Sequence, residues 1–528
     1  NVVYADQNLY TCSQDTQEII KDKVKEHHLN RVVVASCSPR THEPLFRETL
    51  REGGLNQYLF EMANIRDQCS WVHAQDPKGA TEKAKDLVRM AVAKARLTEP
   101  LKKVSIDLTP TALVVGGGVS GMTSALNLAD QGFPVSLVEK TDQLGGHGRH
   151  IYRTLTGGDV QSFLNDLITR VNNHPLIHVY LGSRVADSSG YIGNFITRLN
   201  VGNGTEEEVK HGITILAIGG REYKPNEYFY GQDERVYTAM ELEGILTNAP
   251  ERVEHCSHVV MIQCVGSRNE EHPYCSRVCC GKSLKNALKL KELNPEVNIY
   301  ILYQDMRTYG LMEDFFKEAR DKGVVFLRFD PEDQPVVTKV KEGGKKILRV
   351  EITDAILGER FAIDTDLLQL AAGILAPEDN KILSQFYKVP LNQDGFFLEA
   401  HMKLRPVDFA TDGVFLCGLC HNPKAIEESI SQANAAASRA STILSKEKLE
   451  AEGAIAHIDT ELCVGCKGCM DVCPYLAISY VDDKGTCNIN EVLCKGCGGC
   501  AATCSSGSIR LEGFRHDQIY AQIERAFE

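Results

Sequence analysis

Two cysteine runs near the end of the chain constrain its fold more than any other feature. The runs ELCVGCKGCMDVCP and LCKGCGGCAATCSS both space four cysteines as C-x2-C-x2-C-x3-C. Thiolates at this spacing bind iron–sulfur clusters. A zinc site closes with four ligands and has no need for two runs of three closely spaced cysteines. The predicted cluster ligands are Cys463, Cys466, Cys469, Cys473, Cys494, Cys497, Cys500 and Cys504.

The paired runs resemble a bacterial two-cluster ferredoxin. In that family the last cysteine of each run binds the other run's cluster, and this crossover ties the small domain together. The resemblance implies one [4Fe-4S] cluster on Cys463, Cys466, Cys469 and Cys504, and a second on Cys494, Cys497, Cys500 and Cys473. Ser505 replaces the usual proline after the second run, which affects the turn and leaves the ligand set unchanged. Cys487 lies outside both runs and is expected to be a buried apolar filler.

Composition narrows the class of protein. The chain has 528 residues, 43% of them apolar, and a net charge of −13 without a long basic run, which argues against nucleic-acid binding. No apolar stretch approaches the roughly 20 residues of a membrane span, and no export signal is present, so a cytoplasmic location is expected. In a reducing compartment, 19 cysteines indicate cofactors or redox chemistry instead of disulfides. The first residues look like the middle of a domain, so we expect a segment upstream of Asn1.

A dinucleotide-binding motif follows the first hundred residues. The stretch TALVVGGGVSGMTSALNLADQGFPVSLVEK predicts a strand, a tight turn, a helix and a second strand. Its glycines let a pyrophosphate approach the N-terminus of the helix, and an acid that ends the next strand can accept from a ribose hydroxyl. A Rossmann domain without a ligand is the alternative. The candidate binding residues are Gly116, Gly118, Val119, Ser120, Gly121, Glu139 and Lys140.

Three further segments resemble flavoproteins with two dinucleotide-binding folds, and this resemblance implies FAD. Gly145 and Gly146 match the extension found after the first motif, and the later strand ends at Ala217 and Gly219 in place of the usual A-T-G. Gly418 falls in the segment that closes the flavin site. His147 and Arg149 follow the glycine pair and are candidates for lining the isoalloxazine ring.

The second dinucleotide fold has an unusual turn. In flavoproteins that resemble thioredoxin reductase, this position binds NAD(P)H through glycines, but here the stretch QCVGSRNEEHPYCSRVCCGK has Cys264, Cys275, Cys279 and Cys280. Four thiolates at a strand end and a helix start can hold a [4Fe-4S] cluster, whose negative charge the helix N-terminus favours. A redox disulfide between Cys279 and Cys280, or simple buried filler, are the alternatives.

The predicted fold class is therefore α/β. It is a thioredoxin reductase-like flavoprotein with two dinucleotide-binding domains, an N-terminal α/β domain and a C-terminal bacterial-type 2[4Fe-4S] ferredoxin domain. The expected boundaries are 1–108 for the N-terminal domain, 109–250 and 366–446 for the two parts of the FAD domain, 251–365 for the second Rossmann-like domain, and 447–528 for a linker and the ferredoxin domain.

The N-terminal domain contributes three further cysteines, Cys12, Cys37 and Cys69, each in a polar or turn-like setting. Three ligands are one short of a [4Fe-4S] cluster, so a fourth would have to come from the upstream segment. The alternative is three half-buried thiols in an ordinary α/β domain.

As a set, these motifs resemble the A subunit of heterodisulfide reductase over nearly the entire chain, including YTCSQDTQ, ASCSPRTHEPLFRE and the QCVGSR to YCSRVCC element. The resemblance implies FAD, several [4Fe-4S] clusters and flavin-based electron bifurcation. The implied partners are proteins similar to the B and C subunits of heterodisulfide reductase, ferredoxin, and a hydrogenase- or dehydrogenase-linked electron-donor subunit, with a homodimer inside a larger complex. Many archaeal members insert a ferredoxin module after the first FAD segment, whereas GGHGRHIYRTLTGGDVQSFL here has no cysteine.

Two questions stay open on the sequence alone. Lys285, on the helix after Cys280, is predicted to point towards the flavin, where a cation would stabilise its reduced form, although a surface position is the alternative. Cys417 and Cys420 are either redox-active or packed beside the flavin. The rival function is a stand-alone NAD(P)H oxidoreductase that resembles the flavoprotein subunit of glutamate synthase. Neither the electron donor nor the final acceptor can be named.

Overall fold

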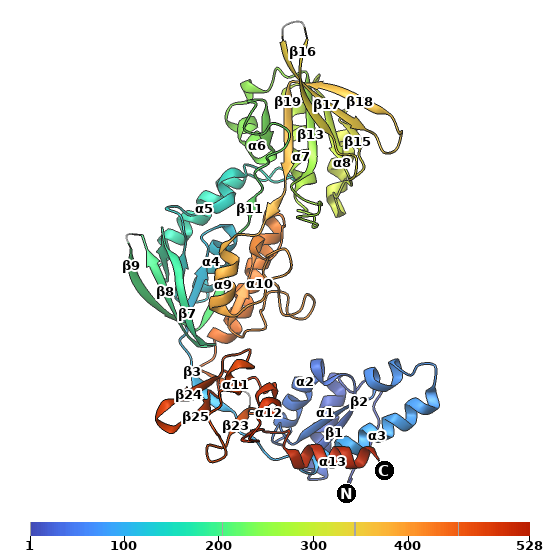
Figure 1. Ribbon diagram of the computed structural model, residues 1–528, viewed down its shortest axis with the longest axis vertical. Coiled ribbons are helices and arrows are strands. Elements are labelled where there is room, and N and C mark those ends of the chain that lie inside the picture. The colour runs from blue at the N-terminus through green and yellow to red at the C-terminus, as the bar shows by residue number, and fades with distance from the viewer. Residues whose placement is uncertain (1, 203, 343–344, 452, 528) are drawn as a thin grey trace. The chain divides into compact units, whose positions relative to one another are not determined.

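A computed structural model describes residues 2–202, 204–342, 345–451 and 453–527, which form two compact units (Figure 1). One unit comprises residues 107–449, and the other joins residues 1–106 to residues 450–528. Among the described residues, no helix is both long and apolar enough to cross a lipid bilayer.

The larger unit contains a first parallel sheet in the order β21-β10-β4-β5-β6, with the chain reversing direction across the sheet between β4 and β10. Ligands of open α/β sheets bind at such a switch point, beyond the carboxyl ends of the strands. The strands are β4 (Ala112–Val115), β5 (Val135–Val138), β6 (Ile177–Tyr180), β10 (Ile213–Leu216) and β21 (Val414–Leu416).

Alternating side chains of β4 divide the core of this sheet into two layers. Ala112 and Val114 pack beneath three helices, and Leu113 and Val115 pack against an antiparallel sheet and a short helix on the other face. The helices of the first face are α4 (Val119–Asp130), α5 (Val160–Asn173) and α10 (Ile426–Leu444). The second face is covered by β7 (Arg184–Tyr191), β8 (Asn194–Val201), β9 (Thr205–His211) and α9 (Asp379–Tyr387).

The second parallel sheet of this unit, in the order β12-β19-β13-β14-β15, is built in the same way (Figure 1). Val259 and Met261 of its central strand pack beneath helices, and Val260 and Ile262 pack against an antiparallel sheet. The strands are β12 (Val236–Thr238), β13 (His258–Val265), β14 (Asn298–Tyr303), β15 (Val325–Arg328) and β19 (Leu367–Ala372). The cover consists of α6 (Ala239–Asn248), α7 (Cys279–Leu293), α8 (Glu313–Asp321), β16 (Val336–Glu342), β17 (Lys345–Thr353) and β18 (Arg360–Thr365).

These two sheets confirm the predicted fold class of two dinucleotide-binding folds in one flavoprotein-like unit. The chain passes between the folds twice, at β11 (Arg221–Glu222) and β20 (Ile374–Leu375), which pair antiparallel. The boundaries proposed for the individual domains stay a prediction.

The smaller unit combines the two ends of the chain. Its N-terminal part has a parallel pair, β1 (Val32–Ser36) and β2 (Phe60–Asn64), with α1 (Gln14–Glu26), α2 (Pro39–Glu52) and α3 (Pro77–Ala95). The last helix, α13 (His516–Ala526), packs on α3 (Figure 1). At this contact Gln518 Nε2 donates to the Leu97 carbonyl at 2.9 Å, and Arg515 pairs with Glu99 at 2.6 Å.

The ferredoxin-like part of the smaller unit has a core built largely of cysteine. Two hairpin-like pairs, β23 (Ala456–Ile458) with β26 (Ile509–Leu511) and β24 (Ile478–Val481) with β25 (Thr486–Ile489), enclose two short helices, α11 (Gly468–Asp471) and α12 (Gly499–Thr503). The aliphatic part of the core is small, and six of the predicted ligand cysteines pack against it or within it: Cys463, Cys469, Cys473, Cys494, Cys500 and Cys504. A core this thin depends on its clusters.

A pair of cysteine substitutions tests this dependence. Cys473→Ala removes a predicted ligand, and Cys487→Ala removes a thiol that is 1% exposed but lies outside both runs. We expect Cys473→Ala to lose about four iron atoms per chain and to make residues 454–515 sensitive to protease, because the cluster replaces an apolar core. Cys487→Ala should keep its iron. Equal iron contents in the two variants, measured with a colorimetric chelator, would contradict the ligand assignment.

Candidate functional site

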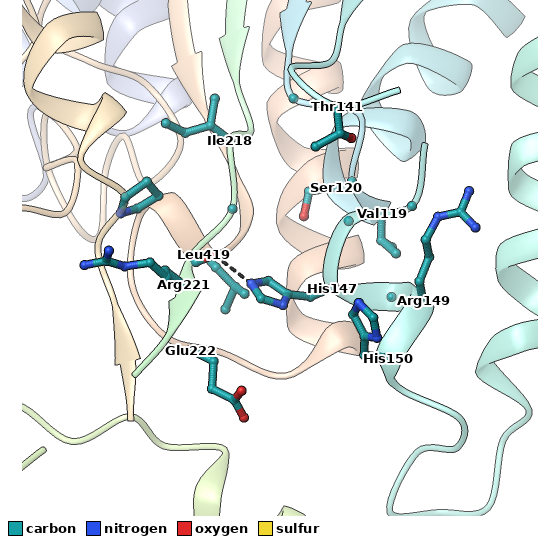
Figure 2. Close-up of a pocket in the computed structure, with 18 of the residues that line it drawn as sticks. Val119, Ser120, Thr141, His147, Arg149, His150, Ile218, Arg221, Glu222 and Leu419 are labelled. Carbon is teal, nitrogen blue, oxygen red and sulfur yellow. Dashed lines mark hydrogen bonds between the residues drawn. The ribbon is translucent and has the colours of Figure 1, made fainter. Parts of the chain in front are cut away.

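The main cavity, of about 1210 Å³, lies beyond the carboxyl ends of the strands of the first sheet (Figure 2). This volume exceeds the roughly 300–1,000 Å³ typical of small-ligand pockets, as an extended dinucleotide requires. Twelve of the predicted binding residues line it: Gly116, Gly118, Val119, Ser120, Glu139, Lys140, Gly145, Gly146, His147, Arg149, Ala217 and Gly219.

The turn between β4 and α4 forms a cradle for a phosphate group. Gly118 is the N-cap of α4 and offers no capping side chain, and a Cβ on it would meet no atom within 4 Å. The amides of the first helical turn are therefore open to an anion at the positive end of the helix. Gly116 has φ +112°, and a Cβ on Gly121 would stand 1.8 Å from the Gly116 carbonyl oxygen, so the turn requires glycine at both positions.

Glu139 sits at the end of β5 with its carboxylate fixed by three donors. It accepts from the Gly117 amide at 2.7 Å, from the Thr141 amide at 2.8 Å and from the Thr141 hydroxyl at 2.7 Å. A smaller, mostly apolar cavity of about 120 Å³ adjoins it, lined by side chains that include Val138, Val185 and Leu383. An oriented carboxylate beside an apolar slot fits a ribose and its base.

Gly418 and Gly121 support this cavity from behind its lining. A Cβ on Gly418 would come within 2.4 Å of the Ser120 hydroxyl oxygen, so only glycine lets the closing segment approach α4. Its amide donates to Gln432 Oε1 at 2.9 Å.

His147 and Arg149 are fixed by backbone carbonyls. His147 Nε2 donates to the Gly220 carbonyl at 2.7 Å (Figure 2), and burial lowers the pKa of His147, which favours the neutral ring. Arg149 Nε donates to the Leu144 carbonyl. Both line the cavity, and their contact with an isoalloxazine ring stays a prediction.

Lys424 also lines the cavity and was not predicted from the sequence. Its ammonium donates to the Gly418 carbonyl and to Gln432 Oε1, both at 2.8 Å, and the residue is 8% exposed. Burial lowers the pKa of Lys424 to about 8, so most molecules carry the charge at neutral pH. The only local signal was its place four residues after Cys420, which does not distinguish a buried lysine from a surface one.

Lys285 does not line the cavity in the described structure. Its ammonium donates to Glu243 Oε1 and to the Arg153 carbonyl, both at 2.7 Å, and burial lowers the pKa of Lys285 to about 8. The surface position considered as the alternative is also not observed, since the side chain is 10% exposed. A role beside the flavin stays a prediction, and these contacts do not favour it.

The second sheet presents four thiols where the first presents glycines. A register shift after Ile262 and a positive φ of 62° at Cys264 turn the end of β13 aside. Cys279 and Cys280 begin α7, and Cys275 precedes them in the connecting loop. Backbone amides point at two of the sulfurs: Arg277 donates to Cys275 Sγ at 3.2 Å, and Arg307 donates to Cys280 Sγ at 3.5 Å.

The pKa values of these thiols show that the four lie together. Burial raises the pKa of Cys279 well above its usual value, and the neighbouring Cys280, Cys264 and Cys275 raise it further. Burial likewise raises the pKa of Cys264 to about 11, with Cys280 as the next cause. Thiols in such a site become thiolates only with a compensating cation, as iron supplies. The donor set therefore fits a [4Fe-4S] cluster.

Among the described residues, no three His, Cys, Asp or Glu side chains are gathered tightly enough for a single metal ion. A cluster makes a different demand, because its thiolates bind separate iron atoms at the corners of a cage.

In the ferredoxin-like part, Cys473, Cys494, Cys497 and Cys500 line one small cavity. Burial and Cys494 raise the pKa of Cys500, with smaller contributions from Cys497 and Cys473. Amides of Ala477 and Ala456 donate to Cys473 Sγ and Cys494 Sγ at 3.3 and 3.4 Å. This grouping supports the predicted crossover of Cys473 to the second run.

The remaining predicted ligands of the other cluster are partly exposed. Cys466 is exposed and Cys463 is half-buried. Burial opposes ionisation of Cys504, but hydroxyls of Ser506 and Ser508 lower its pKa to about 7. The pKa of Cys469 is raised to about 12 by burial and then by Cys487, which lies against it as a filler.

The N-terminal cysteines are less clearly grouped. Cys69 is buried in a π-helical turn, Arg66–Trp71, while Cys37 is half-buried and Cys12 exposed. The pKa of Arg66 is raised chiefly by Asp67, with smaller contributions from Cys37 and Cys12, which places both thiols near this guanidinium. π-Helical turns are frequent at functional sites. A cluster here stays a prediction.

Cys417 and Cys420 are both fully buried, and their contacts favour packing. Cys420 donates to the Cys417 carbonyl at 3.2 Å, and Ser124 Oγ lies 3.6 Å from Cys417 Sγ. Burial raises the pKa of Cys417 to about 12 and that of Cys420 to about 11, which suppresses the reactive thiolates.

One substitution tests the phosphate cradle. Gly118→Val introduces a side chain into open space at the start of α4, so the fold should persist while the anion site is filled. We expect flavin content per chain to fall at least tenfold, measured by absorbance after denaturation, with an unchanged melting temperature of the flavin-free protein. Gly132→Val, at a turn equally free of neighbouring atoms but remote from the cavity lining, should keep its flavin. Normal flavin content in Gly118→Val would contradict this assignment.

Two family models match parts of the chain. A model for an NAD(P)-binding Rossmann-like domain matches residues 114–167, and one for a 4Fe-4S binding domain matches residues 456–479. Thioredoxin reductases of T. acidophilum and Lactococcus lactis, at 16% and 15% identity, cover 63% of this chain and 96% and 99% of their own, with TM-scores of 0.42 and 0.44.

Curated relatives span the whole chain. The second iron-sulfur A subunit of the CoB–CoM heterodisulfide reductase of Methanopyrus kandleri is 38% identical over 623 aligned positions, covering 100% of this chain and 94% of the relative. The A subunit of the H(2):CoB-CoM heterodisulfide,ferredoxin reductase of Methanothermobacter thermautotrophicus is 37% identical, covering 100% and 93%. Because 528 residues align over 623 positions, these alignments contain sizeable insertions in the relatives. The chain belongs to the family of heterodisulfide reductase A subunits, the iron–sulfur electron-transfer subunits of an oxidoreductase.

Proposed function

We propose that this chain carries FAD in the main cavity and passes electrons singly to a [4Fe-4S] cluster held by Cys264, Cys275, Cys279 and Cys280. The observation that carries the proposal is the replacement of a phosphate-binding turn by four adjoining buried thiols at the end of β13 and the start of α7. FAD supplies two-electron chemistry with release of one electron at a time, and [4Fe-4S] clusters accept single electrons.

The turn after β13 is unsuited to a pyridine nucleotide. In the first sheet, β4 ends at Val115 and α4 begins at Val119, so a short glycine turn exposes the amides of the helix. In the second sheet, β13 ends at Val265 and α7 begins at Cys279. The side chains of Cys279 and Cys280, 8% and 6% exposed, occupy the position at the helix start that a pyrophosphate would take.

Arg277 ties the cysteine loop to the flavin-binding part of the same unit. Its amide donates to Cys275 Sγ, while its guanidinium donates to the Pro423 carbonyl at 3.2 Å and to Glu428 Oε1 at 2.6 Å. Glu428 also accepts from the Ala425 amide at 2.9 Å, at the start of α10. The loop is therefore fixed to the segment that places Lys424 in the cavity wall, which holds the separation between flavin and cluster constant.

We further propose that the flavin is the site of electron bifurcation. The name of the Methanothermobacter relative includes both a heterodisulfide and ferredoxin, which are two acceptors for one donor. This chain offers two kinds of exit, the buried thiol site and the two-cluster ferredoxin part. The proposed partners are proteins similar to the B and C subunits of heterodisulfide reductase, ferredoxin, and a hydrogenase- or dehydrogenase-linked electron-donor subunit, with two copies of this chain in the complex.

Reduction by nicotinamide nucleotides separates this proposal from the rival NAD(P)H oxidoreductase. Anaerobic titration of the isolated protein with NADH and with NADPH should leave the flavin absorbance near 450 nm unchanged, because the second fold has no phosphate-binding turn. Dithionite should bleach the flavin fully as the positive control. Rapid bleaching by either nucleotide alone would support the rival.

Iron content tests the cluster itself. Cys275→Ala should lose about four iron atoms per chain and retain FAD, because one ligand of the cluster is gone. Cys256→Ala is the matched control, since Cys256 is 4% exposed in the same fold and lies before β13, apart from the loop. If both variants keep the iron and sulfide content of the unaltered protein, the thiols do not hold a cluster.

A further inference from the structure

Arg268 has a buried donor without a partner. It lies three residues after the end of β13 with φ +58°, and its amide donates to the Tyr274 carbonyl at 3.1 Å. Its Nη2 donates to Asp305 Oδ2 at 2.7 Å, which fixes the guanidinium. The side chain is 18% exposed, and Nη1 is buried with no hydrogen-bond partner among the described residues. A buried unpaired guanidinium N–H is costly and calls for an explanation.

The unpaired group adjoins the four-thiol site. Burial and Cys280 raise the pKa of Cys264, and Arg268 opposes them through a contact with that thiol. For Cys280, burial is again the largest cause, and Arg268 is among the groups that lower its pKa. One guanidinium therefore acts on two of the four sulfurs, from a side chain whose other end is anchored by Asp305.

We propose that Arg268 Nη1 donates a hydrogen bond to a sulfur of the [4Fe-4S] cluster and thereby raises the reduction potential of that cluster. The inference rests on the proposed function, since it requires the cluster at Cys264, Cys275, Cys279 and Cys280. Reduction adds one negative charge to the cluster, so a cation and a hydrogen-bond donor stabilise the reduced form more than the oxidised form. Asp305 acts as a positioning residue because it orients the guanidinium.

The same carboxylate offers a matched control. Arg328 Nη2 lies 3.4 Å from Asp305 Oδ1, and its Nε donates to the Gln304 carbonyl at 2.9 Å. Its side chain is 50% exposed, and no thiol is among its described partners. Arg328→Met thus removes an arginine from the same carboxylate without removing a donor next to a sulfur.

The experiment is an anaerobic redox titration of the full chain with dithionite, followed by EPR. The relevant signal is the one that Cys275→Ala loses. In Arg268→Met we expect its one-electron reduction equilibrium constant to fall at least tenfold, which is about 59 mV. Asp305→Asn should give a smaller fall of the same sign, and Arg268→Lys should recover part of the loss because it keeps the charge. Arg328→Met should stay within threefold of the unaltered protein.

The outcomes separate the two proposals. If the signal is present and its potential in Arg268→Met equals that of the unaltered protein, the inference is overturned while the cluster stands. If the unaltered protein shows no signal that depends on Cys275, the proposed function fails, and the inference falls with it. Should Arg268→Met lose its iron, Asp305→Asn decides: a lowered potential supports the inference, and an unchanged one overturns it.

Discussion

The structure of the larger unit depends on the burial of four thiols at the end of a parallel sheet. Burial raises the pKa values of Cys264 and Cys279, so without a cation the site is a set of neutral thiols surrounded by donors. Amides of Arg277 and Arg307 point at sulfur, and a guanidinium N–H of Arg268 has no partner among the residues that the structure describes. Donors directed at neutral thiols contribute little, whereas donors directed at thiolates on iron stabilise charge. Bound iron would satisfy the thiols and these donors together.

The two dinucleotide-binding folds show how the same architecture supports different chemistry. Both have a parallel sheet with helices on one face and a three-stranded antiparallel sheet on the other. They differ in the turn after the first strand of each sheet motif, where glycine leaves amides open to a phosphate and cysteine fills the same place with sulfur. Function therefore resides in a short loop on a shared scaffold. In the second fold, Arg277 additionally ties that loop to the flavin-binding segment, which suits transfer of electrons between fixed centres better than exchange of a diffusing carrier.

The sequence predicts those features that have a fixed local pattern. The glycines at 116, 118 and 121 with Glu139, and the two cysteine runs, each have a spacing set by backbone geometry or metal ligation, and the structure brings their members together. Features that depend on contacts between distant segments are not predicted. Lys424 is an ordinary lysine in the sequence, and only the approach of Gly418 and Gln432 shows that it is a buried cation in the cavity wall. Lys285 is similar, because its partner Glu243 lies 42 positions earlier on another helix. The packing of α13 on α3 joins segments from opposite ends of the chain, for which no local signal exists.

The most direct test of this account is a crystal structure of the anaerobically purified protein with diffraction recorded at the iron absorption edge. The account predicts a compact anomalous peak enclosed by the sulfurs of Cys264, Cys275, Cys279 and Cys280, with Arg268 Nη1 within hydrogen-bond distance of a cluster sulfur. An ordered pyridine nucleotide at the start of α7, or four thiols with no iron signal between them in crystals whose ferredoxin part is fully loaded, would contradict it.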